Sequence, residues 1–313
     1  MKNPIRIALI QLAYSGRMDS MKAQYRALIA EAAARGANLV CLSEFSLIPY
    51  FPGARQPEGF DYAEPLPGGT SERFFSEMAR QHKVKIVGSL YEEADDGGLF
   101  DTATVHDETG ALVGRTRKIQ IPSGNGYHET DYYAGSDQYP VIQLDALTLA
   151  TPTCYDQWYP EIARIYALGG AELIVYPTAI GDEPEDHVMD TQDAWETVMR
   201  GHAIANGIFI AAVNRVGTEN GVTFYGSSFV CAPDGKILAR AGRASTEVLL
   251  ADLDPTAIPD WRWHFPLLHQ RRASVYGKIL QTWSGDEKPE WVEETPRRRT
   301  KPTGGEILNQ AAD

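Results

Sequence analysis

The chain has 313 residues, and its 42 acidic and 29 basic side chains give a formal net charge of −13 at neutral pH. Hydrophobic residues make up 43% and charged residues 23%, as in an average soluble globular protein. The acidic balance disfavours nucleic-acid binding, which relies on clustered Lys and Arg, and agrees better with a small-molecule partner whose tail is neutral or cationic.

Strand and helix patterns alternate through the first half of the chain. Apolar β-branched runs indicate strands, apolar residues at helical spacing indicate helices, and Gly36 is placed to end the first helix. We predict, in order, a strand at Ile5–Leu12, a helix from Asp19 to about Arg35, a strand at Ala37–Ser43, a helix at Thr70–Lys83, and strands at Val84–Tyr91, Thr102–His106 and Leu147–Thr153.

The second half continues the alternation and then changes to hairpins. A helix is predicted to begin at Pro160, because proline is tolerated at the first helical position. It is followed by a strand at Leu173–Tyr176, a helix at Thr191–Asn206, strands at Ile208–Asn214, Ser227–Cys231 and Val248–Asp252, and a hairpin around Pro233–Gly235. This order predicts an α/β sandwich with mixed sheets.

From about Ser284 the composition becomes polar and rich in Pro and Gly. We therefore predict one domain over residues 1–283 and a polar C-terminal arm or tail over residues 284–313. The basic run Arg297–Arg299 is interpreted as part of this solvated segment rather than as a binding site for an acidic partner.

Cysteine usage and the amino terminus both point to the cytoplasm. Cys41, Cys154 and Cys231 are widely spaced and odd in number, which argues against a disulfide framework. The amino terminus lacks a signal-peptide pattern, and no apolar run approaches the roughly 20 residues of a membrane helix. We expect a protein that is not bound to a membrane.

Several kinds of site are disfavoured by the spacing of the residues they would need. The seven histidines form no metal-binding motif, and neither a Walker loop nor a G-x-S-x-G elbow occurs. The acidic cluster Asp182, Glu183, Glu185 and Asp186 lacks the ligand order of an EF-hand and is interpreted as an exposed loop.

With these sites disfavoured, the remaining candidate is a catalytic site built around a cysteine. Cys154 lies between a predicted strand and a helix, where amide N–H groups favour an anion. Glu44 ends an apolar strand, and Lys118 lies in the basic–apolar segment RTRKIQIP. A thiolate, a carboxylate and an ammonium can together catalyse acyl transfer. Taken alone, however, such residues are more often a buried thiol, a strand-end carboxylate turned to solvent and a surface lysine.

Three segments resemble the catalytic motifs of the nitrilase (carbon–nitrogen hydrolase) superfamily, in that family's order Glu, Lys, Cys. They are LSEFSLIPYF around Glu44, GRTRKIQIP around Lys118 and TCYDQWYPE around Cys154. Further similar segments extend the resemblance over residues 5–280. CYDQWYPE, YPTAIG and RGHAIAN are most similar to the N-carbamoylputrescine amidase branch.

The resemblance implies a role for each matched residue. Glu44 is then the general base, Lys118 stabilises the oxyanion, Cys154 is the nucleophile, and Glu129 positions the substrate or the catalytic groups. The N–H of Tyr155 would be a second oxyanion donor. The chain departs from the branch at Gln120, where relatives usually have histidine.

The implied reaction is hydrolysis of an amide or ureido C–N bond through a thioester-type intermediate, without a metal or organic cofactor. We expect Lys118 and the neighbouring helix terminus to lower the pKa of Cys154 from its usual value. The implied fold is a four-layer α-β-β-α sandwich that forms a homodimer or a larger homo-oligomer.

The substrate is predicted from charges near the nucleophile. Residues 155–159 contain no cation to bind a carboxylate, and the acidic loop at Asp182 offers a partner for an ammonium such as that of putrescine. Aromatic residues, including Phe51 and Tyr159, either line the methylene chain or simply pack in the core. The candidate substrate-binding residues are Tyr50, Tyr155, Trp158, Thr178 and Asp182.

Other functions stay open on the sequence. Within the superfamily they are a β-ureidopropionase-like enzyme, an aliphatic amidase and a true nitrilase, the last disfavoured by CYDQWYPE and YPTAIG. A catalytically silent binding or assembly module is the alternative of another class, although it would not need all three of Glu44, Lys118 and Cys154.

Overall fold

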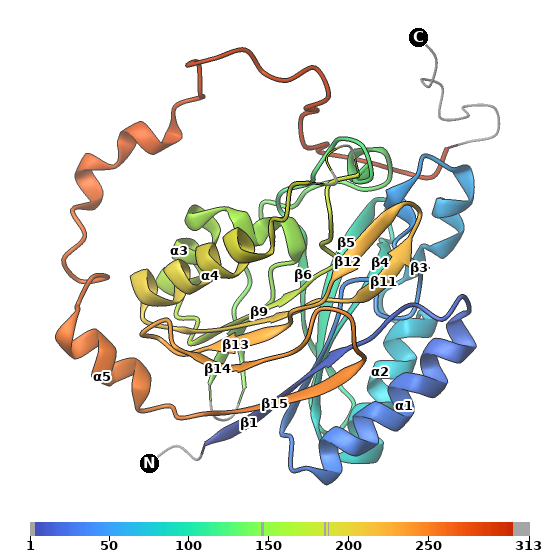
Figure 1. Cartoon of the computed structure of the whole chain (residues 1–313), viewed down its shortest axis with the longest axis horizontal. Helices are drawn as coiled ribbons and strands as arrows, with labels where there is room; N and C mark the ends of the chain where they lie inside the picture. Colours follow the sequence, from blue (N-terminus) through green and yellow to red (C-terminus); the bar gives the residue numbers. More distant parts are fainter. Residues whose placement is uncertain (1–3, 145–146, 185, 187, 303–313) are drawn as a thin grey trace.

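The computed structural model describes residues 4–302, apart from 145, 146, 185 and 187 (Figure 1). Two β-sheets lie face to face between two pairs of helices, so the predicted four-layer sandwich with mixed sheets is confirmed. Among the described residues, no helix is both long and apolar enough to cross a bilayer.

The first sheet has parallel strands at its centre and antiparallel strands at both sides. Strands β1, β2 and β4 run parallel, and β15 and β5 pair with them in the antiparallel sense. Its order is β15 (Glu247–Leu253), β1 (Ile5–Gln11), β2 (Leu39–Leu42), β4 (Lys85–Glu93), β5 (Leu99–His106) and β6 (Leu112–Arg117), with β3 (Glu64–Pro65) also paired to β4.

The second sheet has the same mixed character, with β8, β9 and β10 parallel. Its order is β14 (Ile237–Arg240), β13 (Phe229–Cys231), β10 (Phe209–Val213), β9 (Leu173–Pro177), β8 (Thr148–Ala150) and β7 (Ile142–Gln143). A separate ribbon pairs β11 (Val216–Glu219) with β12 (Val222–Tyr225).

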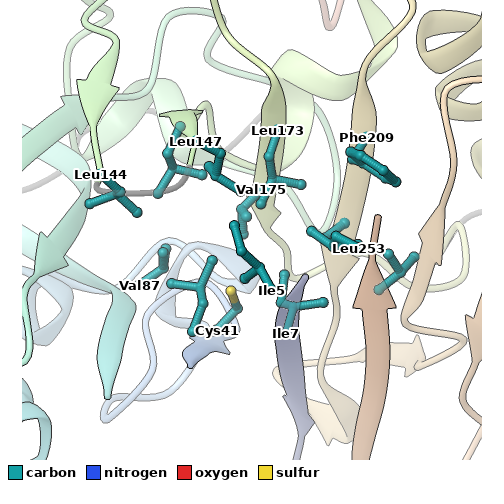
Figure 2. Close-up of a cluster of buried hydrophobic side chains, with 14 of the residues drawn as sticks. Ile5, Ile7, Cys41, Val87, Leu144, Leu147, Leu173, Val175, Phe209 and Leu253 are labelled. Atoms are coloured by element: carbon teal, nitrogen blue, oxygen red, sulfur yellow. The ribbon is translucent and has the colours of Figure 1, made fainter. Parts of the chain in front are cut away.

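Three apolar clusters hold the layers together. Between the sheets, Ile7, Cys41, Val175 and their neighbours form the central core (Figure 2). Helices α1 (Met18–Ala34) and α2 (Thr70–His82) pack on the first sheet, and α3 (Pro160–Leu168) and α4 (Gln192–Asn206) pack on the second. Strands buried on both faces explain why their sequences are continuously apolar rather than alternating.

Short helices and an extended arm complete the chain. Helix α5 (Ala257–His264) follows β15, and the chain then arcs away from the sandwich and returns to its opposite end (Figure 1). The 3-10 helices are η1 (Phe51–Gly53), η2 (Pro57–Tyr62), η3 (Glu129–Asp131), η4 (Cys154–Trp158), η5 (Ala273–Val275) and η6 (Gly277–Leu280).

Candidate active site

A buried ammonium lies among three carboxylates at the centre of the candidate site. Lys118, directly after β6, places its Nζ 2.8 Å from Glu44 Oε1 and 2.5 Å from Glu129 Oε2. Asp101 Oδ2, on β5, lies 3.6 Å from the same nitrogen. All four side chains are shielded from solvent, so each charge depends on the others for compensation.

The backbone around Glu44 is held by a buried guanidinium. Arg215 donates from Nη2 to the carbonyl oxygens of Glu44 and Phe45, at 3.0 and 2.9 Å, and to that of Ile48. Its Nη1 pairs with both carboxylate oxygens of Glu219. Phe45 has a left-handed backbone with φ 46°, a turn that these contacts stabilise.

Cys154 begins the 3-10 helix η4 and has a left-handed φ of 42°. Such a backbone costs about 1–3 kcal/mol in a non-glycine residue, and it persists only where surrounding contacts fix it. The Sγ atom lies 3.8 Å from the carbonyl oxygen of Ala179. This elbow exposes the thiol to the pocket at the start of a short helix.

Asp156 links the cysteine segment to the lysine segment. Its carboxylate accepts hydrogen bonds from the N–H groups of Ile119, Gln120 and Thr153, at 2.8–3.2 Å. Burial raises the pKa of Asp156 to about 7, against the opposing effect of these donors. Ile119, the residue after Lys118, and Thr153, the residue before Cys154, are therefore both hydrogen-bonded to the Asp156 side chain.

The charges shift the pKa values of the cluster. Burial alone would lower the pKa of Lys118, but Glu129 and Glu44 outweigh it and hold that pKa well above its usual range. Burial raises the pKa of Glu129, partly offset by Lys118. Burial and the Glu44 carboxylate raise the pKa of Cys154 well above that of a free thiol.

The expectation of a lowered Cys154 pKa is therefore wrong for the resting site. Lys118 does favour the thiolate, but desolvation and the negative charge of Glu44 oppose it more strongly. The raised pKa favours the protonated thiol near neutral pH, so a nucleophilic role for Cys154 would require this proton to leave as the sulfur attacks. A carboxylate oxygen is available, because Glu44 Oε2 is buried without a hydrogen-bond partner among the described residues.

A pocket of about 350 Å³ opens above Cys154. Glu129 and Cys154 lie in its wall together with aromatic and apolar side chains, and Glu183 is the other carboxylate among the described lining residues. The described residues that line it are Pro122, Ser123, Tyr127, Glu129, Cys154, Tyr155, Trp158, Ile180, Glu183, Met189, Thr191 and Trp291.

Of the five predicted substrate-binding residues, two line the pocket and three lie outside its lining. Tyr155 and Trp158 line the pocket. Tyr50 is buried behind it and donates its hydroxyl to Glu129 Oε1 at 2.7 Å. Thr178 lies outside the lining and donates to the Tyr176 carbonyl oxygen. Asp182 also lies outside it.

Within the acidic loop, adjacent carboxylates face different neighbours. Asp182 Oδ1 accepts the N–H of Thr223 at 2.7 Å, so this carboxylate binds the edge of the β11–β12 ribbon. Glu183 lines the pocket instead, where burial raises its pKa. Glu185 lies outside the described residues.

The chain is similar to known proteins over most of its length. Residues 6–262 match the carbon-nitrogen hydrolase family. The chain belongs to this family. It is 36% identical over 290 residues to an N-carbamoylputrescine amidase from Solanum lycopersicum, covering 90% of this chain and 96% of the relative. It is 32% identical to a citrullinase from Francisella tularensis, covering 89% of this chain and 99% of that protein.

A solved structure shows the same fold. The carbon-nitrogen hydrolase from Helicobacter pylori G27 superposes with a TM-score of 0.86 at 35% identity, over 90% of this chain and all of that one. This hydrolase therefore acts on non-peptide C–N bonds, as its relatives do.

The structure assigns positions to residues that the sequence analysis missed. Asp101 faces Lys118, Arg215 holds the Glu44 turn, and Asp156 joins two segments. The sequence signal for Asp101 is an acidic residue directly before the strand predicted at Thr102–His106. Nothing in the sequence distinguishes Arg215 from a surface arginine.

The raised pKa of Cys154 predicts how the resting hydrolase reacts with an alkylating agent. Since the thiolate fraction rises about tenfold per pH unit below the pKa, the rate of iodoacetamide addition at Cys154 should keep rising from pH 7 to 9. Mass spectrometry of the Cys154 peptide measures this rate. A plateau below pH 8 would instead show a thiolate already formed at rest.

Proposed function

We propose that this hydrolase cleaves an N-carbamoyl amine with a cationic tail, of which N-carbamoylputrescine is the best candidate. The observation that carries the proposal is the charge of the pocket. Among its described lining residues none is Arg, Lys or His, whereas Glu129 and Glu183 are acidic. A substrate carboxylate would find no cation there, and an ammonium finds Glu183.

The proposed reaction begins with proton transfer from the thiol of Cys154 to Glu44. The sulfur forms a bond with the ureido carbon as its carbonyl oxygen gains charge. Lys118 donates hydrogen bonds to Glu44 and Glu129, and Asp101, at 3.6 Å, lies beyond hydrogen-bond distance, so the third N–H is assigned to this oxyanion. The Tyr155 N–H, in the first turn of η4, is the second donor.

The C–N bond then breaks, and the leaving nitrogen takes the proton held by Glu44. Water attacks the carbonyl carbon of the S-acyl intermediate while Glu44 accepts a proton from it. The bond between this carbon and the sulfur of Cys154 then breaks, and Glu44 returns the proton to the sulfur. The hydrolysis releases a carbamic acid, which loses CO2 spontaneously as its own C–N bond breaks, so the final products are the amine, CO2 and ammonia. Glu129 is hydrogen-bonded by Tyr50 and Lys118, and it keeps the lysine oriented during both acylation and hydrolysis of the intermediate.

Ammonia release from three ureido compounds tests the substrate. We expect N-carbamoylputrescine to be hydrolysed well, and N-carbamoyl-β-alanine and L-citrulline poorly, because both carry a carboxylate. Cys154→Ala is the inactive control. Preference for the β-alanine compound would favour a β-ureidopropionase-like enzyme, and inactivity towards these and simple amides would favour the silent binding module.

Glu183 is expected to bind the ammonium of the tail. Glu183→Gln should raise the KM for N-carbamoylputrescine by about tenfold, equivalent to about 1.4 kcal/mol, and leave kcat nearly unchanged. N-Butylurea, which has a similar chain without the ammonium, should show no such change. Steady-state kinetics of both compounds provide the measurement.

The adjacent variant Asp182→Asn is the matched control, since that carboxylate contacts Thr223 outside the pocket lining. If Asp182→Asn raised KM and Glu183→Gln did not, the assignment of Glu183 would be wrong.

A further inference from the structure

The C-terminal arm returns to the catalytic end of the molecule after its excursion away from the sandwich (Figure 1). Residues 290–302 lie against the segments that carry Lys118 and Glu129. The N–H of Leu99 donates to Arg299 O and that of Gly135 donates to Pro296 O, both at 2.9 Å. The arm is thus hydrogen-bonded to the body by its backbone.

Glu293 fixes the arm at the rim of the pocket. Its carboxylate accepts from Thr130 Oγ1 at 2.7 Å and from Arg55 Nη2 at 3.3 Å, and its own N–H donates to Ser123 Oγ at 2.9 Å. Thr130 is the residue next to Glu129, so the arm is anchored beside the buried charge cluster.

Two glycines of the body leave room for arm side chains. A Cβ on Gly124 would lie 3.0 Å from Trp291 Cε3, and a Cβ on Gly135 would collide with Thr295 Cγ2. Gly124 also has a φ of +112°, which other residues rarely adopt. The arm therefore sits in a surface shaped to receive it.

Trp291 lies where two cavities meet. It lines the 350 Å³ catalytic pocket and also an outer cavity of about 700 Å³. Tyr127, Glu183 and Met189 line both cavities as well, and Glu290, Glu293 and Asp186 line only the outer one. A substrate tail leaving the pocket therefore passes beside the Trp291 ring.

We propose that Trp291, a residue of the arm, determines substrate specificity. Its side chain restricts the pocket so that substrates with unbranched tails enter and substrates with bulky tails do not. Trp291 lies beyond residue 262, where the match to the carbon-nitrogen hydrolase family model ends. The identity of the tail rests on the proposed function, but the steric selection at Cys154 does not depend on it.

Alkylation of Cys154 tests the steric restriction by Trp291 without a substrate. Iodoacetamide and iodoacetanilide react alike, with an S–C bond formed, iodide released and the thiol proton lost, but the second reagent carries a phenyl ring. Trp291→Ala should raise the rate of Cys154 alkylation by iodoacetanilide at least tenfold relative to the rate of alkylation by iodoacetamide. Mass spectrometry separates the Cys154 peptide from those of Cys41 and Cys231, which line neither cavity.

Trp283→Ala is the matched control, because Trp283 belongs to the same arm, is 79% exposed and lines neither cavity. It should leave the ratio of the two rates unchanged. Glu293→Ala, which releases the anchor, should shift the ratio in the same direction as Trp291→Ala. An unchanged ratio in Trp291→Ala would overturn the proposal.

Kinetics with two ureas separate this inference from the proposed function. Trp291→Ala should improve kcat/KM for a branched N-alkylurea relative to N-butylurea. If the ratio of alkylation rates changes but the wild type does not hydrolyse N-carbamoylputrescine, only the proposed function fails. If the wild type hydrolyses it and the ratio does not change, only the role of Trp291 fails.

Discussion

Lys118→Met is expected to abolish hydrolysis and to destabilise the fold at the same time. Loss of one oxyanion donor costs about 10²–10³ in kcat, and the lysine also orients Glu44 and Glu129, so we expect a loss of at least about 10³. Removing one partner of a buried ion pair costs about 3–5 kcal/mol, because the remaining charges lose their compensation. Ammonia release and urea unfolding measure the two effects.

The instability of Lys118→Met should depend on pH with a definite sign. Burial already raises the pKa values of Asp101 and Glu129 above those of the unfolded chain. Without the ammonium, the folded state binds still more protons than the unfolded state near neutrality. The contribution of these two carboxyl groups to stability is then fully present below their unfolded pKa of about 4 and is lost as pH rises, so the variant should be more stable at pH 5 than at pH 8.

A second substitution separates folding from catalysis. Lys118→Met with Glu129→Gln removes one uncompensated carboxylate, so it should recover part of the unfolding free energy but no turnover. Lys85→Met is the control, because Lys85 pairs with the more exposed Glu108 and should cost less than about 1 kcal/mol. Wild-type stability of Lys118→Met at pH 8 would contradict the charge compensation described here.

Most regular elements were predictable because burial on both faces produces long apolar runs. The strand predicted at Ile5–Leu12 is found at Ile5–Gln11, and the helix predicted at Thr191–Asn206 is found at Gln192–Asn206. Strand β6 was missed because it lies at a sheet edge, where Arg115 and Arg117 reach back to Glu92. The β11–β12 ribbon was missed for a similar reason, being paired outside both sheets.

The candidate site was predictable only in its central residues. Glu44, Lys118 and Cys154 each follow a strand within a distinctive motif, and the structure places Lys118 against Glu44. Whether Asp182 or Glu183 faces the pocket depends on which of the two carboxylates binds the β11–β12 ribbon. No local sequence pattern determines this. The approach of Trp291 depends on a long excursion of the chain, so its sequence indicated only a solvated tail.

Arg215→Met is expected to lower the unfolding free energy by about 3–5 kcal/mol although Arg215 lies outside the pocket lining. The substitution leaves Glu219 buried without its cation and removes the donor to three carbonyl groups of the Glu44 turn. Arg215 is 1% exposed, so water cannot readily replace these contacts. Urea unfolding measures the loss.

The activity of Arg215→Met should reveal a positioning role. A misplaced Glu44 slows proton transfer, so kcat should fall by about 10-fold or more while KM changes little. Arg215→Lys retains the charge for Glu219 but not the planar set of donors, and should recover stability more than kcat. Arg240→Met is the matched control, because Arg240 also pairs with both oxygens of a glutamate but is half-exposed. A kcat equal to that of the wild type in Arg215→Met would show that the Glu44 turn holds its geometry without this guanidinium.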